Sequence, residues 1–139
     1  MQYRNTGKEI AIRLDDGEEI IESLQSICKI EEVESALITG IGAACKTEIG
    51  HWDPEDKKYN VKKFEGSLEI ISLNGNVAML NNEPMVHIHI VIGKEDFSTK
   101  SGHLISAIIK PTCEIVLLPI STRINREKDS KTKLSLQKF

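Results

Sequence analysis

The chain has 139 residues, of which 40% are hydrophobic and 28% are charged, and its formal net charge is −3. This length suits one domain over residues 1–139, with an apolar core large enough to fold without a disulfide or a structural metal. The composition excludes a disordered chain, and no apolar run approaches the ~20 residues of a membrane helix. The opening MQYRNTGKEIAIRL lacks the apolar stretch of a secretory signal, so we expect a cytoplasmic protein.

The cysteines and the charge distribution exclude further classes. Cys28, Cys45 and Cys113 are odd in number and form no CxxC pair, which indicates reduced thiols and not a disulfide framework or a thiolate zinc site. Residues 1–122 carry 12 basic and 19 acidic side chains, whereas residues 123–139 carry 6 basic and 2 acidic ones. This basic segment could meet nucleic acid, but without an aromatic or arginine-rich recognition element it is more typical of a solvated final strand.

One strand and one helix are predicted at the start of the chain. Residues 8–14, KEIAIRL, alternate apolar and polar side chains as a half-buried strand does, and Asp15-Asp16-Gly17 is typical of a turn. A helix is predicted from Glu18 to about Ile30, because acidic residues precede an apolar stripe with spacings of three and four: Ile20, Leu24, Ile27 and Cys28.

The remainder is predicted to consist of short strands. They are SALITGIG (35–42), KTEIGHW (46–52), KYNVKKF (58–64), SLEIISLNGNVAML (67–80), VHIHIVIG (86–93) and TCEIVLLPI (112–120). Turn signals occur at 53–56, 74–76 and 81–84, and Gly102 predicts a tight turn within 98–110, with a helical or extended return after it. The fold class is therefore α/β in the broad sense (α+β): a mainly antiparallel sheet with one principal helix packed on it.

The strand VHIHIVIG suggests a site. Successive strand side chains point to opposite faces, so His87 and His89 share one face and the apolar residues share the other. His103 follows 14 residues after His89, enough chain to return to the same region. Three imidazoles can hold a zinc-like divalent ion and leave one position for water or a small anionic ligand. Paired strand histidines also occur as hydrogen-bonded residues without a metal, and both interpretations stand.

Two other features bear on function, the glycines of TGIGAA and the acidic residue Glu69. Gly40 and Gly42 in TGIGAA lack the third glycine and the helix start of a dinucleotide-binding loop, which favours sheet glycines that admit a close neighbour. Glu69 alternates with Leu68 and Ile70 and is predicted to point inward. It is a candidate for supporting a metal ligand or for acid–base catalysis, and a salt bridge to a lysine is the alternative.

Four blocks in order resemble the PPC domain of plants and prokaryotes, in its stand-alone prokaryotic branch. They are residues 64–76 (FEGSLEIISLNGN), the His87 to His89 strand, residues 101–104 (SGHL) and residues 112–115 (TCEI), preceded by Trp52-Asp53-Pro54 and Tyr59. The resemblance covers nearly the whole chain. Ser101 departs from it, because the family commonly has Gly-Gly before the last histidine.

The resemblance implies a homotrimer with a mainly antiparallel sheet. It also implies that HxH followed by GH forms a metal site, here His87, His89 and His103, with zinc the expected ion. Prokaryotic members are commonly described as predicted DNA-binding proteins, so a DNA-associated role, in which the domain serves trimerisation and partner contacts, is the alternative function. Against direct DNA binding, the chain has no Arg-Gly-Arg-Pro element and residues 1–122 are acidic overall.

Overall fold

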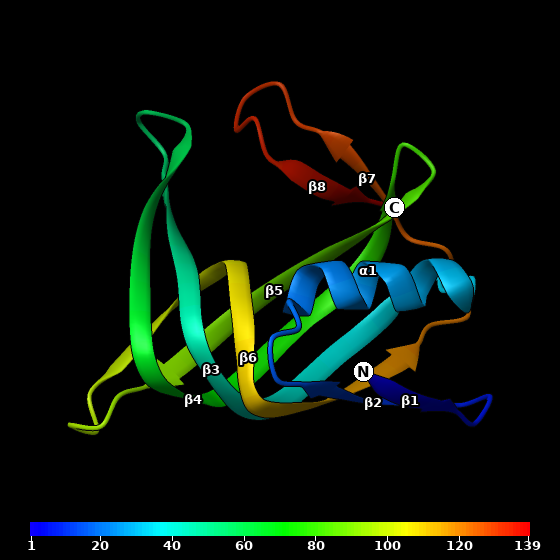
Figure 1. The fold of residues 1–139 in the computed structure, drawn as a ribbon. Helices are drawn as coiled ribbons and strands as arrows, with labels where there is room; N and C mark the ends of the chain where they lie inside the picture. Colours follow the sequence, from blue (N-terminus) through cyan, green and yellow to red (C-terminus); the bar gives the residue numbers. More distant parts are fainter.

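The computed structural model describes residues 1–139, which form eight strands and one helix (Figure 1). The elements are β1 (Gln2–Asn5), β2 (Ile10–Asp15), α1 (Ile20–Ile30), β3 (Ala36–Asp53), β4 (Lys58–Leu80), β5 (Glu83–Gly93), β6 (Thr99–Pro119), β7 (Asn125–Lys128) and β8 (Ser135–Lys138).

All strands belong to one mainly antiparallel sheet, as the sequence predicts. The strand order is β1-β2-β6-β3-β4-β7-β8, and β5 pairs with both β4 and β6. Because β6 also pairs with β3 and β3 with β4, the four long strands close into a ring of pairs. The only parallel contact is the bridge between β4 and β7. This ring brings the middle of β5 beside the start of β6, where the histidines lie.

The predicted helix is present, and it begins two residues later than expected. Glu19 is its N-cap: one carboxylate oxygen accepts a hydrogen bond from the Glu22 N–H at 2.8 Å, and the other accepts from the Ala107 N–H at 2.9 Å. The cap therefore also ties α1 to β6. The helix packs on β5 and β6 with its predicted apolar stripe buried: Ile20, Leu24, Ile27 and Cys28.

Several predicted strands are parts of longer ones. The segments 35–42 and 46–52 join into β3, and 58–64 and 67–80 join into β4. An irregularity in strand pairing between Ala44 and Lys46, opposite residues 65–68 of β4, coincides with both expected breaks. Two more lie between Gly40 and Gly42 and between Ile70 and Ser72. Such bulges bend a strand without ending it, which explains the curvature of the long strands in Figure 1.

Two predicted turns are wrong. Residues 74–76 lie inside β4, and Gly102 lies inside β6, paired with Ile90 of β5. The turns at 53–56 and at Asn81-Asn82 are confirmed, and both asparagines adopt positive φ, as hairpin turns require. Gly75 marks a close approach of two strands, not a change of direction.

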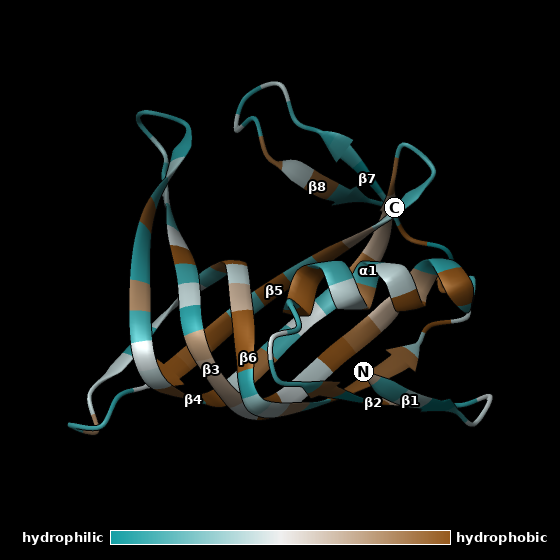
Figure 2. Ribbon diagram, in the orientation of Figure 1, coloured by the Kyte–Doolittle hydropathy of each residue, from teal (hydrophilic) through white to brown (hydrophobic).

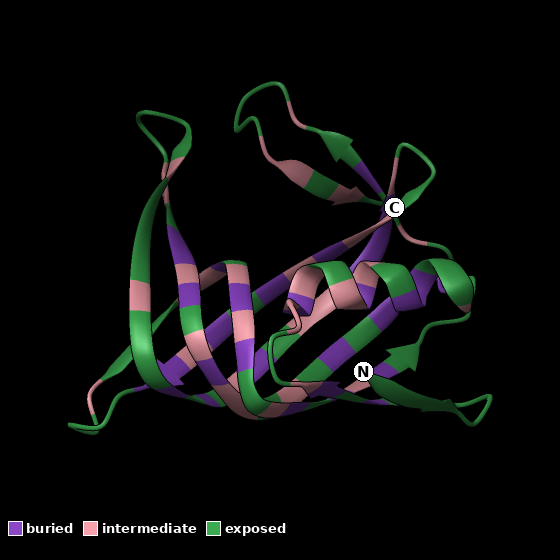
Figure 3. Cartoon of the chain, viewed as in Figure 1, coloured by how far each residue is buried: buried purple, intermediate pink, exposed green.

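The core lies between α1 and the inner face of the sheet. Twenty-six buried residues form one apolar cluster, including Ile88, Ile90 and Ile92 on the inner face of β5. Figure 2 shows apolar residues along the long strands and polar residues at the hairpin tips and on β7 and β8, and Figure 3 shows the matching alternation of buried and exposed positions.

No helix is long and apolar enough to cross a membrane. The three cysteines are free, and burial raises the pKa of the Cys28 thiol to about 11.

The basic C-terminal segment is an ordered hairpin, β7 with β8, and not a single frayed strand. Its charges are partly neutralised: Arg123 pairs with Glu34 at 2.5 Å and Lys138 pairs with Glu127 at 2.7 Å. In Figure 1 this hairpin and the β3–β4 hairpin both project toward the top of the view.

Candidate metal centre

Strand geometry brings three histidines together. His87 and His89 point to one side of β5, while Val86, Ile88 and Ile90 are buried on the other. His103 of β6 is the direct cross-strand partner of His89. Directly opposed residues on antiparallel strands have their side chains about 5 Å apart, so two positions on β5 and one on β6 make a triangle. The predicted cluster therefore forms by direct pairing of two strands.

The three rings are close enough to share one ion. Their centroids are 5.3 Å apart for His87 and His89, 5.0 Å for His87 and His103, and 5.6 Å for His89 and His103. One nitrogen from each ring lies within 4.8 Å of the others. His87 and His103 are half-buried and His89 is exposed, so the triangle has one side toward solvent.

The cluster favours neutral imidazoles. The pKa of His87 is lowered to about 4, mainly by burial and also by the neighbouring His103, Arg126 and His89. Burial and His89 also lower the pKa of His103. No histidine forms a salt bridge with a carboxylate. Neutral imidazole is the form that binds metal ions, so His87 and His103 are in the form that could bind one at neutral pH.

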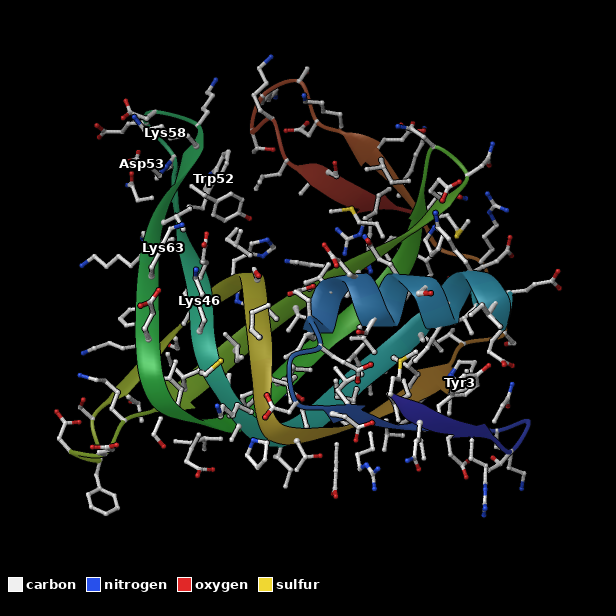
Figure 4. The ribbon with its side chains drawn as sticks, viewed as in Figure 1. Tyr3, Lys46, Trp52, Asp53, Lys58 and Lys63 are labelled. Carbon is white, nitrogen blue, oxygen red and sulfur yellow. The ribbon has the colours of Figure 1, made fainter.

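Two aromatic residues support His103. The Tyr59 ring stacks on the His103 ring, with centroids 4.6 Å apart and an interplanar angle of 17°. Trp52 contacts Tyr59 edge-on at 5.1 Å, and Figure 4 places Trp52 on the β3–β4 hairpin beside Asp53. Gly50 leaves the space for Tyr59, because a Cβ there would lie 2.8 Å from the Tyr59 ring. The His103 Nδ1 atom is buried and has no hydrogen-bond partner.

A buried arginine borders His87. Arg126 of β7 donates hydrogen bonds to the Ser135 carbonyl oxygen and to Asn76 Oδ1, both at 2.7 Å. Its Nη2 atom lies 3.3 Å from His87 Nδ1. Since Asn76 is the β4 partner of His87, this contact connects β4, β5 and the C-terminal hairpin.

The glycine in β4 allows the strands to approach at the site. Gly75 pairs with Ile88, the residue between His87 and His89. A Cβ on Gly75 would lie 2.1 Å from the His87 carbonyl oxygen, a distance that backbone atoms do not tolerate. The spacing of β4 and β5 at the two histidines therefore depends on this residue.

The other predicted site residues lie apart from the cluster. Glu69 is exposed and pairs with Gly93, so its expected inward orientation is wrong, because the bulge after Ile70 ends the simple alternation. The structure does not place it with the histidines. His51 is exposed on β3 and outside the cluster. Gly40 and Gly42 are sheet glycines, as predicted: a Cβ would lie 2.7 Å from the Glu114 carbonyl oxygen and 2.5 Å from the Cys113 Cα atom, respectively.

Arg126 and Asn76 border the cluster without having been predicted to do so. Neither stands near the histidines in the sequence, and a single arginine in a basic segment carries no local signal. For Tyr59, the resemblance gave a position in a hairpin and no role. Only the pairing of the strands shows that these three residues lie beside the histidines.

Fold and site together define a class of protein: a small β-sheet domain with an open cluster of three strand histidines. Within that class, the profile of the Plants and Prokaryotes Conserved (PCC) domain matches residues 1–121. The chain belongs to this family.

Solved structures agree with the assignment. A "putative DNA binding protein" from Bacteroides thetaiotaomicron has 32% sequence identity and a TM-score of 0.95, over 99% of this chain and 96% of the other. A protein from Archaeoglobus fulgidus described as metal-containing has 34% identity and a TM-score of 0.89, over 100% and 99%. A plant- and prokaryote-conserved (PPC) protein from Pyrococcus horikoshii has 34% identity and a TM-score of 0.89, over 99% and 95%. None of the curated proteins compared with the sequence matches it significantly.

Proposed function

We propose that the protein binds one divalent metal ion per chain, zinc, through His87, His89 and His103. The observation that carries this proposal is the convergence of three imidazoles without any acidic partner, one of which has a buried and unpartnered Nδ1 atom. Nitrogen ligands suit zinc and related ions, and three protein ligands are typical of sites that keep one position open. The description of the Archaeoglobus fulgidus relative as metal-containing supports the proposal.

The chain's own residues have distinct roles in this proposal. Burial keeps His87 and His103 neutral, and Tyr59 fixes the ring plane of His103. The exposed side of the cluster at His89 admits water or a small anionic ligand. A bound zinc ion would supply Lewis acidity and a more acidic water, which is the chemistry of hydration and hydrolysis.

Metal content per chain tests the proposal. Untagged protein is incubated with zinc, desalted and measured by elemental mass spectrometry beside the His87→Ala, His103→Ala and His51→Ala variants. We expect about one ion per chain in the parent and in His51→Ala, and its loss in the two cluster variants. A parent without zinc, or cluster variants that keep it, would refute the metal site.

We further propose that the protein assembles as a homotrimer through the outer face of its sheet. Leu37 and Leu118 are cross-strand partners on this face, and they are 49% and 40% exposed. Ile41, four residues further along β3, is 60% exposed, and Ile71 borders the same hollow as Ile41 and is 52% exposed. Several exposed apolar side chains on one face of a sheet are typical of a subunit interface.

A DNA-associated role is the second candidate, supported by the description of the Bacteroides thetaiotaomicron relative. Lys128, Lys131 and Lys133 of the C-terminal hairpin form no salt bridges, and a trimer would present three such hairpins. An electrophoretic mobility shift with duplex DNA at low and moderate salt tests it. Binding that weakens as salt rises would support this role, and absence of binding at low salt would exclude direct contact with DNA.

A further inference from the structure

Arg126 is a buried cation without a counter-ion. Its side chain is only 8% exposed, and no carboxylate of the chain forms a salt bridge with it. Its Nε atom is buried and has no hydrogen-bond partner. Buried charges in proteins are almost always paired, because removing an ion from water without a partner is costly. An anion from solution is therefore the partner that this arginine lacks.

The contact between Arg126 and His87 is incompatible with metal binding by His87. A guanidinium only donates, so His87 Nδ1 must accept at this contact and the proton of the neutral ring is on Nε2. If the metal binds Nδ1, that lone pair is no longer available to Arg126. If the metal binds Nε2, the proton moves to Nδ1, where it faces the guanidinium donor. In both cases an Arg126 N–H loses its acceptor when the ion binds.

We propose that Arg126 and the three histidines form a composite site that binds a divalent ion together with a small oxyanion. This inference rests on the proposed metal site and identifies the chemical class of the ligand that occupies its open side. The released N–H of Arg126, its unpartnered Nε–H and the positive charge of the ion all attract the oxyanion. Guanidinium recognises carboxylate and phosphate oxygens through paired N–H donors. The two ligands therefore bind cooperatively, each strengthening the binding of the other.

The test measures the Kd of zinc by isothermal titration calorimetry in sodium chloride, sodium acetate and sodium sulfate at equal ionic strength. Acetate represents planar carboxylates and sulfate represents tetrahedral oxyanions. For the parent we expect zinc to bind about fivefold or more tightly in at least one oxyanion salt than in chloride. The salt that produces the effect identifies which kind of oxyanion the site prefers.

Variants of Arg126 separate this role from a merely structural one. In Arg126→Gln we expect the oxyanion effect to vanish, while zinc binds in chloride at least as tightly as in the parent, because a nearby positive charge and a competing donor are gone. A structural role alone would weaken zinc binding in all three salts. Arg126→Lys keeps the charge without the planar fork, and we expect a reduced oxyanion effect. If circular dichroism shows that Arg126→Gln does not fold, Arg126→Lys replaces it in the test.

Arg123→Gln is the matched control. Arg123 is an exposed arginine three residues earlier that already pairs with Glu34, so its loss should leave the oxyanion effect unchanged. An oxyanion effect that persists in Arg126→Gln, or a parent that binds one zinc per chain without any such effect, would overturn the composite site and leave the metal site intact. A parent that binds no zinc would overturn both.

Discussion

His103 has an aromatic ring on one face and the other two histidines nearby, so its orientation depends on a residue that binds no metal. The stacking contact with Tyr59 is made by its ring. We expect Tyr59→Leu to weaken zinc binding by about tenfold, the lower end of what is typical for residues that orient metal ligands. Calorimetric Kd values check this prediction.

Tyr59→Phe is the matched variant, because it keeps the ring and removes only the hydroxyl. We expect it to bind zinc as the parent does. Equal weakening in both variants would show that the hydroxyl matters, and no weakening in Tyr59→Leu would show that stacking does not orient His103.

Proton binding to His87 connects the site to stability. Its pKa is lowered from 6.5 to about 4 in the folded protein, so between these values the unfolded chain takes up a proton that the folded chain does not. The free energy of unfolding of the metal-free protein should therefore fall as the pH decreases from 6.5 to 4, by at most about 3 kcal/mol from this group. Urea denaturation with a chelator present, at several pH values, measures it.

His87→Gln should reduce this loss of stability at low pH, since the group that takes up the proton is removed. His51→Gln is the control, because His51 is exposed and outside the cluster. A pH profile of His87→Gln that is as steep as that of the parent would assign the loss to other groups.

At the scale of strands, the close contact of β4 with β5 is the most sensitive point. A methyl group on Gly75 would meet the His87 carbonyl oxygen, so the two strands would have to separate where both metal ligands are anchored. We expect Gly75→Ala to destabilise the protein by about 2–3 kcal/mol, in the range of overpacked cores, and to weaken zinc binding as well. Asn74→Ala, an exposed position on the same strand, should change stability by less than about 0.5 kcal/mol. Urea denaturation of both variants checks this, and equal stabilities would contradict it.

The strands also show which features the sequence could predict. Spacings of three and four predicted the helix, and alternation predicted the strand segments and the shared face of His87 and His89, because these features depend on local periodicity. It did not distinguish a continuous strand from a turn at Gly75 or Gly102, because both glycines lie where another backbone segment approaches closely. Arg126 was missed because its place beside His87 depends on how the C-terminal hairpin docks on β4.

At the scale of the whole molecule, the outer face of the sheet is the proposed interface of the trimer. Ile41 and Ile30 are 60% and 62% exposed, but only Ile41 belongs to the apolar patch with Leu37 and Leu118, whereas Ile30 ends the helix. If the patch is the trimer interface, a buried lysine there would have no partner, and Ile41→Lys should convert the trimer to monomers. Ile30→Lys introduces the same charge elsewhere and should leave the trimer intact. Sedimentation equilibrium of the two variants and the parent distinguishes these outcomes, and a monomeric parent or a trimeric Ile41→Lys would exclude this interface.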